Sequence, residues 1–160
     1  MGTGKTSVGS LVASLLHFQM LDTDQMIEEG AGRSISQIFA QDGEPKFRAL
    51  ERQVVESLAG TKGAVISTGG GLAANRDNLE NLKKHSLVVC LWASPETIWE
   101  RVRHQSHRPL LHDPQPQEKI RRLLAEREPF YRQADVLIGT DQRSVREIAS
   151  HILHHWDRQQ

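Results

Sequence analysis

The sequence has little cysteine, few aromatic residues, no long apolar run and no excess of charge of either sign. Its one cysteine, Cys90, excludes a disulfide framework within the chain. No apolar stretch approaches the roughly 20 residues of a membrane span, and the first residues lack the zones of a secretory signal. The 20 basic and 20 acidic residues cancel, so no overall field attracts nucleic acid or an anionic membrane. We therefore expect a cytoplasmic protein with neither partner, in which any bound anion is held by a local site.

The 160 residues are enough for one domain with a core and too few for two ordinary ones, so we expect a single domain over residues 1–160. Apolar residues recur at helical spacing from Phe47, from Ile120 and from Val145. Short apolar runs alternate with these segments, at residues 19–21, 64–67, 87–92 and 136–138. This alternation favours a three-layer α/β fold, in which helices cover both faces of a parallel sheet. Ligands of such sheets bind beyond the carboxyl ends of the strands.

Capping patterns mark three helix starts, and a proline-rich segment marks a loop. Ser34 and Ser144 are each followed three residues later by Gln or Glu, and Ser94 precedes a proline, as is typical of helix N-termini. Residues 104–117 hold three prolines and Arg108, so they cannot form one continuous helix or strand. A loop that closes an arginine over a nucleotide excludes water and brings positive charge to the transferring phosphoryl group. Taken alone, Arg108 also fits an ordinary surface arginine.

The first residues contain most of a Walker A motif. Gly4, Lys5 and Thr6 fill the last three places of the pattern G-x-x-x-x-G-K-[ST], and an apolar helical pattern follows. In this motif backbone N–H groups at a helix N-terminus face the phosphates, the lysine reaches the β- and γ-phosphates, and the hydroxyl coordinates Mg²⁺. The first glycine of the pattern would fall two places before Met1. The segment therefore fits either a phosphate-binding loop or a glycine-rich tail before a helix.

Three further patterns suit a site near the strand ends. Asp22 and Asp24 follow the first apolar run on an expected extended backbone, where two carboxylates suit Mg²⁺ and the proton of an acceptor hydroxyl. Asp24 as a simple helix cap is the alternative. Residues 69–71 are three glycines after a strand, which indicates either a close approach to the backbone or a flexible connector. Arg48 and Glu51 are spaced for an ion pair on one helix face, as ordinary surface pairs also are.

In this order the motifs resemble those of the shikimate kinase family, and the resemblance covers nearly the whole chain. The segments that carry it are Gly2–Thr6, Asp22–Asp24, Phe47–Arg48 with Glu51, Gly69–Gly71, Arg108–Leu111 and Arg127–Tyr131. The resemblance implies transfer of the γ-phosphate of ATP to the 3-hydroxyl of shikimate, on the route to chorismate and the aromatic amino acids. The products would be shikimate 3-phosphate and ADP, Mg²⁺ would be the cofactor, and we expect a monomer.

The resemblance also implies a role for each site residue. Asp24 would be the base at the acceptor hydroxyl, and Lys5 and Arg108 would be catalytic beside it. Shikimate would be bound by Asp24, Arg48, Gly70, Gly71 and Arg127, with Glu51 orienting Arg48. ATP would be bound by Gly2, Thr3, Gly4, Lys5, Thr6, Ser7, Arg101 and Arg108, and Mg²⁺ by Thr6 and Asp22.

The fold that the resemblance implies is the P-loop kinase fold. In this family a parallel sheet in the order 2-3-1-4-5 lies between helices, and a lid, here at about residues 104–117, covers the nucleotide. The central first strand would be missing from this sequence. We therefore expect Met1 to be an internal methionine and the functional protein to begin upstream of it.

Two other functions stay open at this point. A related small-molecule kinase, such as a gluconate kinase, would share the loop and the lid. Arg48, the three glycines and Arg127 argue against it, because together they form an acid-binding set. A catalytically silent paralogue would bind ligand without turnover. The retained Lys5, Asp24 and Arg108 argue against the silent paralogue, whereas the absent first loop glycine argues for it.

Overall fold

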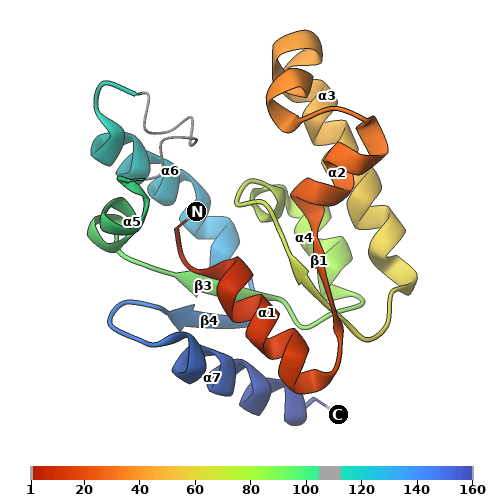
Figure 1. The fold of residues 1–160 in the computed structure, drawn as a ribbon, viewed down its shortest axis with the longest axis vertical. Coiled ribbons are helices and arrows are strands. Elements are labelled where there is room, and N and C mark those ends of the chain that lie inside the picture. The colour runs from red at the N-terminus through yellow and green to blue at the C-terminus, as the bar shows by residue number, and fades with distance from the viewer. Residues whose placement is uncertain (1, 105–112, 160) are drawn as a thin grey trace.

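Helices surround short parallel strands in the computed structural model, which describes residues 2–104 and 113–159 (Figure 1). The α-helices of this part are α1 (Lys5–Leu16), α2 (Thr23–Ala31), α3 (Ile35–Ser57), α4 (Arg76–Lys83), α5 (Pro95–Val102), α6 (Pro116–Tyr131) and α7 (Val145–Asp157). Its strands are β1 (Gln19–Asp22), β2 (Ala64–Ser67), β3 (Val89–Trp92) and β4 (Val136–Gly139), and its 3₁₀ turns are η1 (Leu58–Gly60) and η2 (Leu72–Ala74). All four predicted strands are therefore present, with β3 two residues shorter at its start than predicted.

The strands form two parallel pairs. β1 pairs with β2, so that Asp22 lies opposite Ser67, and β3 pairs with β4, so that Trp92 lies opposite Gly139. Among the described residues no strand joins β2 to β3. The arrangement fits the expected order 2-3-1-4-5 when β1 to β4 are strands 2 to 5 and the central place holds no described strand. The predicted α/β class with parallel strands is confirmed.

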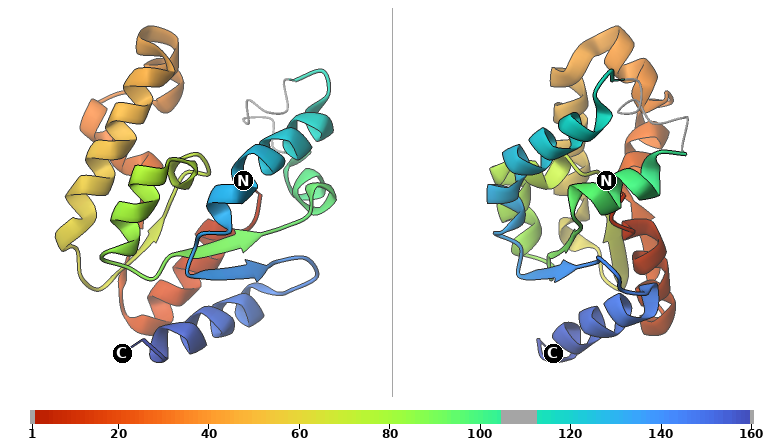
Figure 2. Two further views of the ribbon diagram at one scale, coloured as in Figure 1. Left: turned by 180° about the vertical axis from the view of Figure 1, so that it is seen from behind. Right: turned by 90° about the vertical axis from the view of Figure 1, so that its left-hand side faces the viewer.

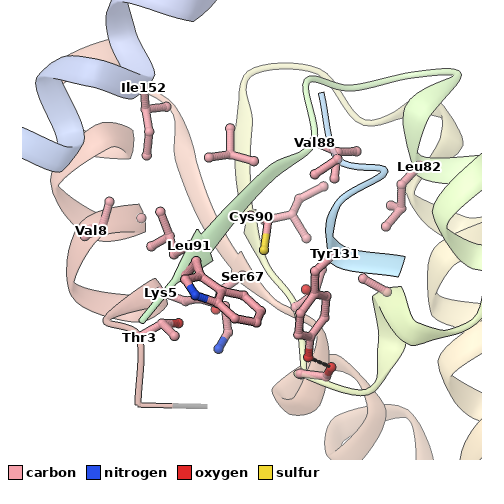
Figure 3. A pocket seen from close by; sticks show the side chains of 18 of the residues that line it. Thr3, Lys5, Val8, Ser67, Leu82, Val88, Cys90, Leu91, Tyr131 and Ile152 are labelled. Carbon is pink, nitrogen blue, oxygen red and sulfur yellow. Dashed lines mark hydrogen bonds between the residues drawn. The ribbon is translucent and has the colours of Figure 1, made fainter. Parts of the chain in front are cut away.

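A cavity of about 260 Å³ lies between β2 and β3, and we call it the interstrand slot. Apolar side chains line it from both sides of β3: Val8 and Ile152 on the side of α1 and α7, and Leu82 with Tyr131 on the other side (Figure 3). Parallel strands inside a sheet are normally buried on both faces. Every residue of β3 nevertheless keeps partial exposure, because the slot runs along one of its edges.

Six of the seven described helices pack in pairs around the strands, and α4 packs on α3 and η2. α1 lies against α7, with Val12 and Ile148 in one core cluster. α5 lies against α6, with Ile98 and Ile120 in a second cluster. α2 and α3 pack on each other through a third cluster, around Ile27, and project away from the strands (Figures 1 and 2). The N-terminal loop consequently lies between the α2–α3 pair and the α5–α6 pair (Figure 1).

The predicted helix caps are present. Ser34 and Ser144 each form a capping box, in which the serine hydroxyl accepts an N–H bond and the residue three positions later bonds back to the serine N–H. Ser94 accepts a bond from the Thr97 N–H and caps α5. These signals are read correctly from sequence because each acts within four residues.

Two boundaries differ from the sequence-based expectation. α2 begins at Thr23, because the Asp22 carboxylate caps it, so Asp24 lies in the first helical turn. The prediction of an extended backbone through Asp24 is therefore wrong. α6 begins at Pro116, so the last two residues of the predicted loop 104–117 are helical. A proline is tolerated there because the first-turn N–H of a helix has no intrahelical partner to lose.

Candidate active site

The N-terminal loop has the backbone that a phosphate-binding loop needs. Gly2 and Gly4 adopt left-handed conformations, with φ of 62° and 88°, which other residues rarely adopt. Gly4 is the N-cap of α1 and makes no side-chain cap bond, so Lys5 and the next residues form an uncapped helix N-terminus. Backbone N–H groups at such a terminus are available to an anion. The local structure therefore favours the phosphate-binding loop over a glycine-rich tail.

Close packing also holds this loop in place. A Cβ atom on Gly2 would lie 2.9 Å from a side-chain methyl of Val102 in α5. Arg101, the predicted nucleotide-side arginine, donates from Nη1 to the Gly2 carbonyl at 3.3 Å and to Thr140 Oγ1 at 3.0 Å. Its Nη2 donates to the Thr140 carbonyl at 2.9 Å. Arg101 thus joins the loop to the segment after β4, a link that the sequence did not reveal.

The two aspartates after β1 have different environments. Asp22 Oδ1 accepts bonds from the N–H groups of Asp24 at 2.9 Å and Gln25 at 3.3 Å. Asp24 is half-buried, and its pKa is raised above the ordinary value by burial and, to a lesser degree, by the charge of Asp22. The charge of Lys5 opposes this rise. A carboxylate with a raised pKa holds a proton more strongly, which suits a base.

Arg48 is held by two carboxylates of unequal burial. Its Nη1 donates to Glu51 at 2.6 Å, and its Nε and Nη2 donate to Glu44 at 3.1 and 2.8 Å. The Glu51 side chain is 2% exposed, whereas that of Glu44 is 62% exposed. The predicted Arg48–Glu51 pair is therefore confirmed, and it is not an ordinary surface pair.

The pKa values of this pair show which effect dominates at each partner. Burial raises the pKa of Glu51, and the bond and charge of Arg48 oppose the rise without cancelling it. Burial lowers the pKa of Arg48, but its bonds to Glu51 and Glu44 together outweigh burial and leave that pKa raised. The two upward shifts are consistent, because burial dominates at the nearly inaccessible carboxylate and pairing dominates at the more exposed guanidinium.

The three glycines after β2 are packed against the charged residues. A Cβ atom on Gly69 would lie 2.6 Å from Asp24 Oδ1, and one on Gly71 would lie 2.7 Å from Arg48 Nη1. The N–H of Gly69 donates to Oγ1 of the fully buried Thr23 at 3.1 Å. Side chains at positions 69 and 71 would therefore displace the aspartate and the arginine. This packing favours the close-approach interpretation over a flexible connector.

Helix α6 completes the group of charged residues. Arg127 lies one turn before Tyr131, whose hydroxyl donates to the Gly70 carbonyl at 2.6 Å (Figure 3). The charges of Asp24 and Arg127 both affect the pKa of Glu51, in opposite directions, after the larger effects of burial and Arg48. The structure thus brings Asp24, Arg48 and Arg127 together around residues 69–71. No role was predicted for Tyr131, whose position four residues after Arg127 places the two side chains on one face of α6 but does not indicate the contact with Gly70.

The structure gives no geometry for the predicted lid and no complete set of protein ligands for the predicted metal among the described residues. Arg108 and most of the predicted lid lie outside the described residues. Within residues 2–104 and 113–159, no group of three His, Cys, Asp or Glu side chains could hold a metal ion by itself. The histidines of α7 therefore form no such group, and Thr6 and Asp22 belong to no such group either.

These features define a class of enzyme. An α/β fold with parallel strands, in which a glycine-containing N-terminal loop leads into a helix that begins with lysine, is typical of the P-loop kinases. Phosphoryl transfer in such proteins depends on positioning and on charge at the phosphates, and the loop, Lys5 and the half-buried Asp24 provide groups for both. We therefore place the chain among the small-molecule P-loop kinases.

Comparisons with known proteins identify the family. A family model described as shikimate kinase matches residues 1–157. The shikimate kinase of Caldanaerobacter subterraneus subsp. tengcongensis is 43% identical over 96% of this chain and 90% of its own length, and that of Geobacter metallireducens is 45% identical over 95% and 85%. The chain belongs to the shikimate kinase family and is a phosphotransferase with an alcohol group as acceptor.

Solved structures agree with this assignment. A shikimate kinase from Acinetobacter baumannii, in complex with shikimate, matches 100% of this chain and 90% of its own, with a TM-score of 0.92 and 38% identity. The enzyme from Aquifex aeolicus matches 98% of this chain and 92% of its own, with a TM-score of 0.85 and 35% identity. The described part of the chain contains no helix that is long and apolar enough to cross a membrane.

Proposed function

We propose that this chain transfers the γ-phosphate of ATP to the 3-hydroxyl of shikimate, with Asp24 accepting the proton of that hydroxyl. The products are shikimate 3-phosphate and ADP. The observation that carries the proposal is the meeting of Asp24, Arg48 and Arg127 around the glycines that follow β2. A base beside two arginines suits an acceptor that has both a hydroxyl and a carboxylate.

Each residue at the acceptor end has a distinct task. Arg48 and Arg127 bind the carboxylate, because a guanidinium donates in a planar fork that fits two carboxylate oxygens. Gly70 and Gly71 line the ring of the acid with backbone only, since the charged side chains already occupy the space around this loop. Glu51 orients Arg48 through the 2.6 Å bond. The acid is thereby held with its hydroxyl toward Asp24.

The nucleotide end is formed by the N-terminal loop. The backbone from Gly2 to Ser7 surrounds the phosphates, and Lys5 donates to them from the first turn of α1. Thr6 and Asp22 supply hard oxygen donors, which fit Mg²⁺, an ion usually held by one or two carboxylates together with substrate phosphates. When bound, Mg²⁺ offsets negative charge on the phosphates. Arg101 lies on the nucleotide side, and Arg108 is assigned to the phosphates by the resemblance to the family alone.

A coupled assay for ADP release tests the proposed function. Shikimate and gluconate are offered separately with ATP and Mg²⁺, and we expect release only with shikimate. Chelation of Mg²⁺ should stop the reaction, and its readdition should restore it. Preference for gluconate would identify the related kinase instead. Binding of shikimate in calorimetry without ADP release would identify a silent paralogue. We further propose that the protein is cytoplasmic and monomeric. Light scattering of the purified protein measures its molar mass and so tests the monomer.

Burial predicts different effects for the two carboxylates that contact Arg48. Glu51→Gln should raise the KM for shikimate about tenfold, because the buried ion pair with Arg48 becomes a weaker bond from the guanidinium to a neutral amide oxygen. Glu44→Gln should change that KM by less than about twofold, because solvent screens an exposed pair. Steady-state kinetics with saturating ATP measures both values. Equal effects of the two substitutions would show that burial does not decide the contribution of a carboxylate here.

A further inference from the structure

We propose that Tyr131 is a positioning residue for the acid substrate, because its hydroxyl fixes the backbone of residues 69–71 relative to the end of α6 that carries Arg127. The inference rests on the proposed function, since it concerns the place where shikimate would bind. It adds a residue whose hydroxyl bonds to the Gly70 carbonyl and also interacts with Arg127. No catalytic step is assigned to the tyrosine itself.

Tyr131 links three parts of the fold. It is the last residue of α6, and its hydroxyl bonds at 2.6 Å to the Gly70 carbonyl, 61 residues away in sequence. Its ring lies edge-on to Trp92 at the carboxyl end of β3, with 6.4 Å between ring centroids. The phenol therefore extends from the end of β3 to residues 69–71, which we call the glycine loop (Figure 3). A shift of α6 would be transmitted to Gly70 through this bond, in addition to the packing of α6 on η2.

The other side of the glycine loop is held in a matching way. The Gly69 N–H donates to Thr23 Oγ1 at 3.1 Å, and Thr23 is the neighbour of Asp24. The loop is thus anchored on one side next to the base and on the other side on the helix of Arg127. Glycines have no side chains to fix their own position, so these two bonds help to set the distance between base and carboxylate-binding arginine, together with the turn bonds from the Leu72 and Ala74 N–H groups to the Gly69 and Gly71 carbonyls. A misplacement of about 1 Å at such a site can cost on the order of 100-fold in rate.

A role as an acid or base does not fit Tyr131. Its hydroxyl proton is already donated to a carbonyl. Burial raises the pKa of Tyr131, and the neighbouring Arg127 opposes the rise without cancelling it, so the phenol stays protonated at neutral pH. A purely structural bond is the remaining alternative. The two roles differ in what a substitution changes: positioning alters the KM for shikimate, whereas a structural bond alters stability alone.

Tyr131→Phe removes only the hydroxyl and tests the proposal. The control is Ser57→Ala, which also removes a hydroxyl that donates to a backbone carbonyl, at 2.7 Å, on the exposed face of α3. We expect Tyr131→Phe to raise the KM for shikimate about 5- to 10-fold, the effect of one lost hydrogen bond, while the KM for ATP and the Tm change little. The control should leave both KM values unchanged. Replacement of Tyr131 by 4-aminophenylalanine, which keeps a donor, should restore most of the affinity and covers the case that Tyr131→Phe fails to fold.

The outcomes separate this inference from the proposed function. If the unsubstituted protein phosphorylates shikimate and Tyr131→Phe keeps its KM, the positioning role is wrong and the proposed function stands. A lower Tm with an unchanged KM likewise assigns the bond a structural role only. An equal rise in the KM for ATP would also overturn the inference, because the effect would not be confined to the acid site. Absence of shikimate turnover in the unsubstituted protein would overturn both.

Discussion

Replacement of Asp24 by asparagine is expected to lower kcat about 100- to 10,000-fold, the usual contribution of a general base, while the KM for shikimate changes little. Asparagine keeps the size and the hydrogen-bonding capacity of the side chain but cannot accept the proton of the hydroxyl. Its contact with Gly69 should therefore be retained. The coupled assay for ADP release measures kcat, and an unchanged kcat would exclude Asp24 from the role of base.

The same substitution is expected to raise the stability of the folded protein at neutral pH. The pKa of Asp24 is raised in the folded state, chiefly by burial, so the charged carboxylate destabilises the fold relative to the unfolded chain. Asparagine removes that cost. The gain should be largest above the raised pKa and should disappear as the pH falls below the ordinary value of 3.8, where the carboxyl is protonated in both states. Thermal unfolding at pH 7 and at about pH 3.5 measures it.

Asp77→Asn provides the matched control for both effects. Asp77 lies in the first turn of α4, as Asp24 lies in the first turn of α2, but its side chain is exposed. We expect kcat to be unchanged and the Tm to fall slightly, because a negative charge near a helix N-terminus is favourable. A gain in Tm of equal size in the two variants would show that burial of Asp24 is not the cause.

Local sequence patterns were sufficient for much of this fold. The capping boxes at Ser34 and Ser144 and the proline after Ser94 were predictable because each depends on residues within one helical turn. The start of α2 was not. Asp22 is both the last residue of β1 and the cap of α2, whereas the sequence suggested either an extended backbone through Asp24 or a cap at Asp24 itself.

The charge pair and the glycines show where sequence reasoning stops. The spacing of Arg48 and Glu51 fits both an exposed and a buried pair, and only the packing of α3 makes Glu51 inaccessible. The three glycines indicated a close approach but not which residues approach, because Asp24 and Arg48 come from other elements. The bond between Tyr131 and Gly70 spans 61 residues, so no local pattern indicates it.

The interstrand slot predicts that an added apolar strand will stabilise the domain strongly. The facing edges of β2 and β3 have no partner among the described strands, and apolar side chains line the space between them. Backbone N–H and C=O groups at such edges need partners, and the lining gains stability when it is covered. Because Thr3 and Lys5 also line the slot, a strand joined ahead of residue 2 can enter it directly.

The expected gain in the free energy of unfolding is the difference between the stabilising contacts of the added strand and the entropy cost of ordering it. About four residues would match the neighbouring four-residue strands and gain roughly 2 kcal/mol per buried apolar side chain and about 1 kcal/mol for one hydrogen bond per residue. Ordering the backbone and side chains costs about 2 kcal/mol per residue, so on the order of 3 to 5 kcal/mol remains. That corresponds to a rise in Tm of about 10 °C for a protein of this size. Differential scanning calorimetry of chains extended by an apolar segment and by a Gly/Ser segment of equal length measures the difference.

The extension should also raise activity, because the slot ends at the phosphate-binding loop. A strand that pairs with β2 and β3 would fix the backbone leading into Gly2, which is now held mainly by Arg101 and by contact with α5. We expect a lower KM for ATP in the chain with the apolar extension than in the Gly/Ser chain, and a smaller change in the KM for shikimate. Equal Tm values for the two extended chains would show that the slot does not accept a strand, and the unpaired edges of β2 and β3 would then need another explanation.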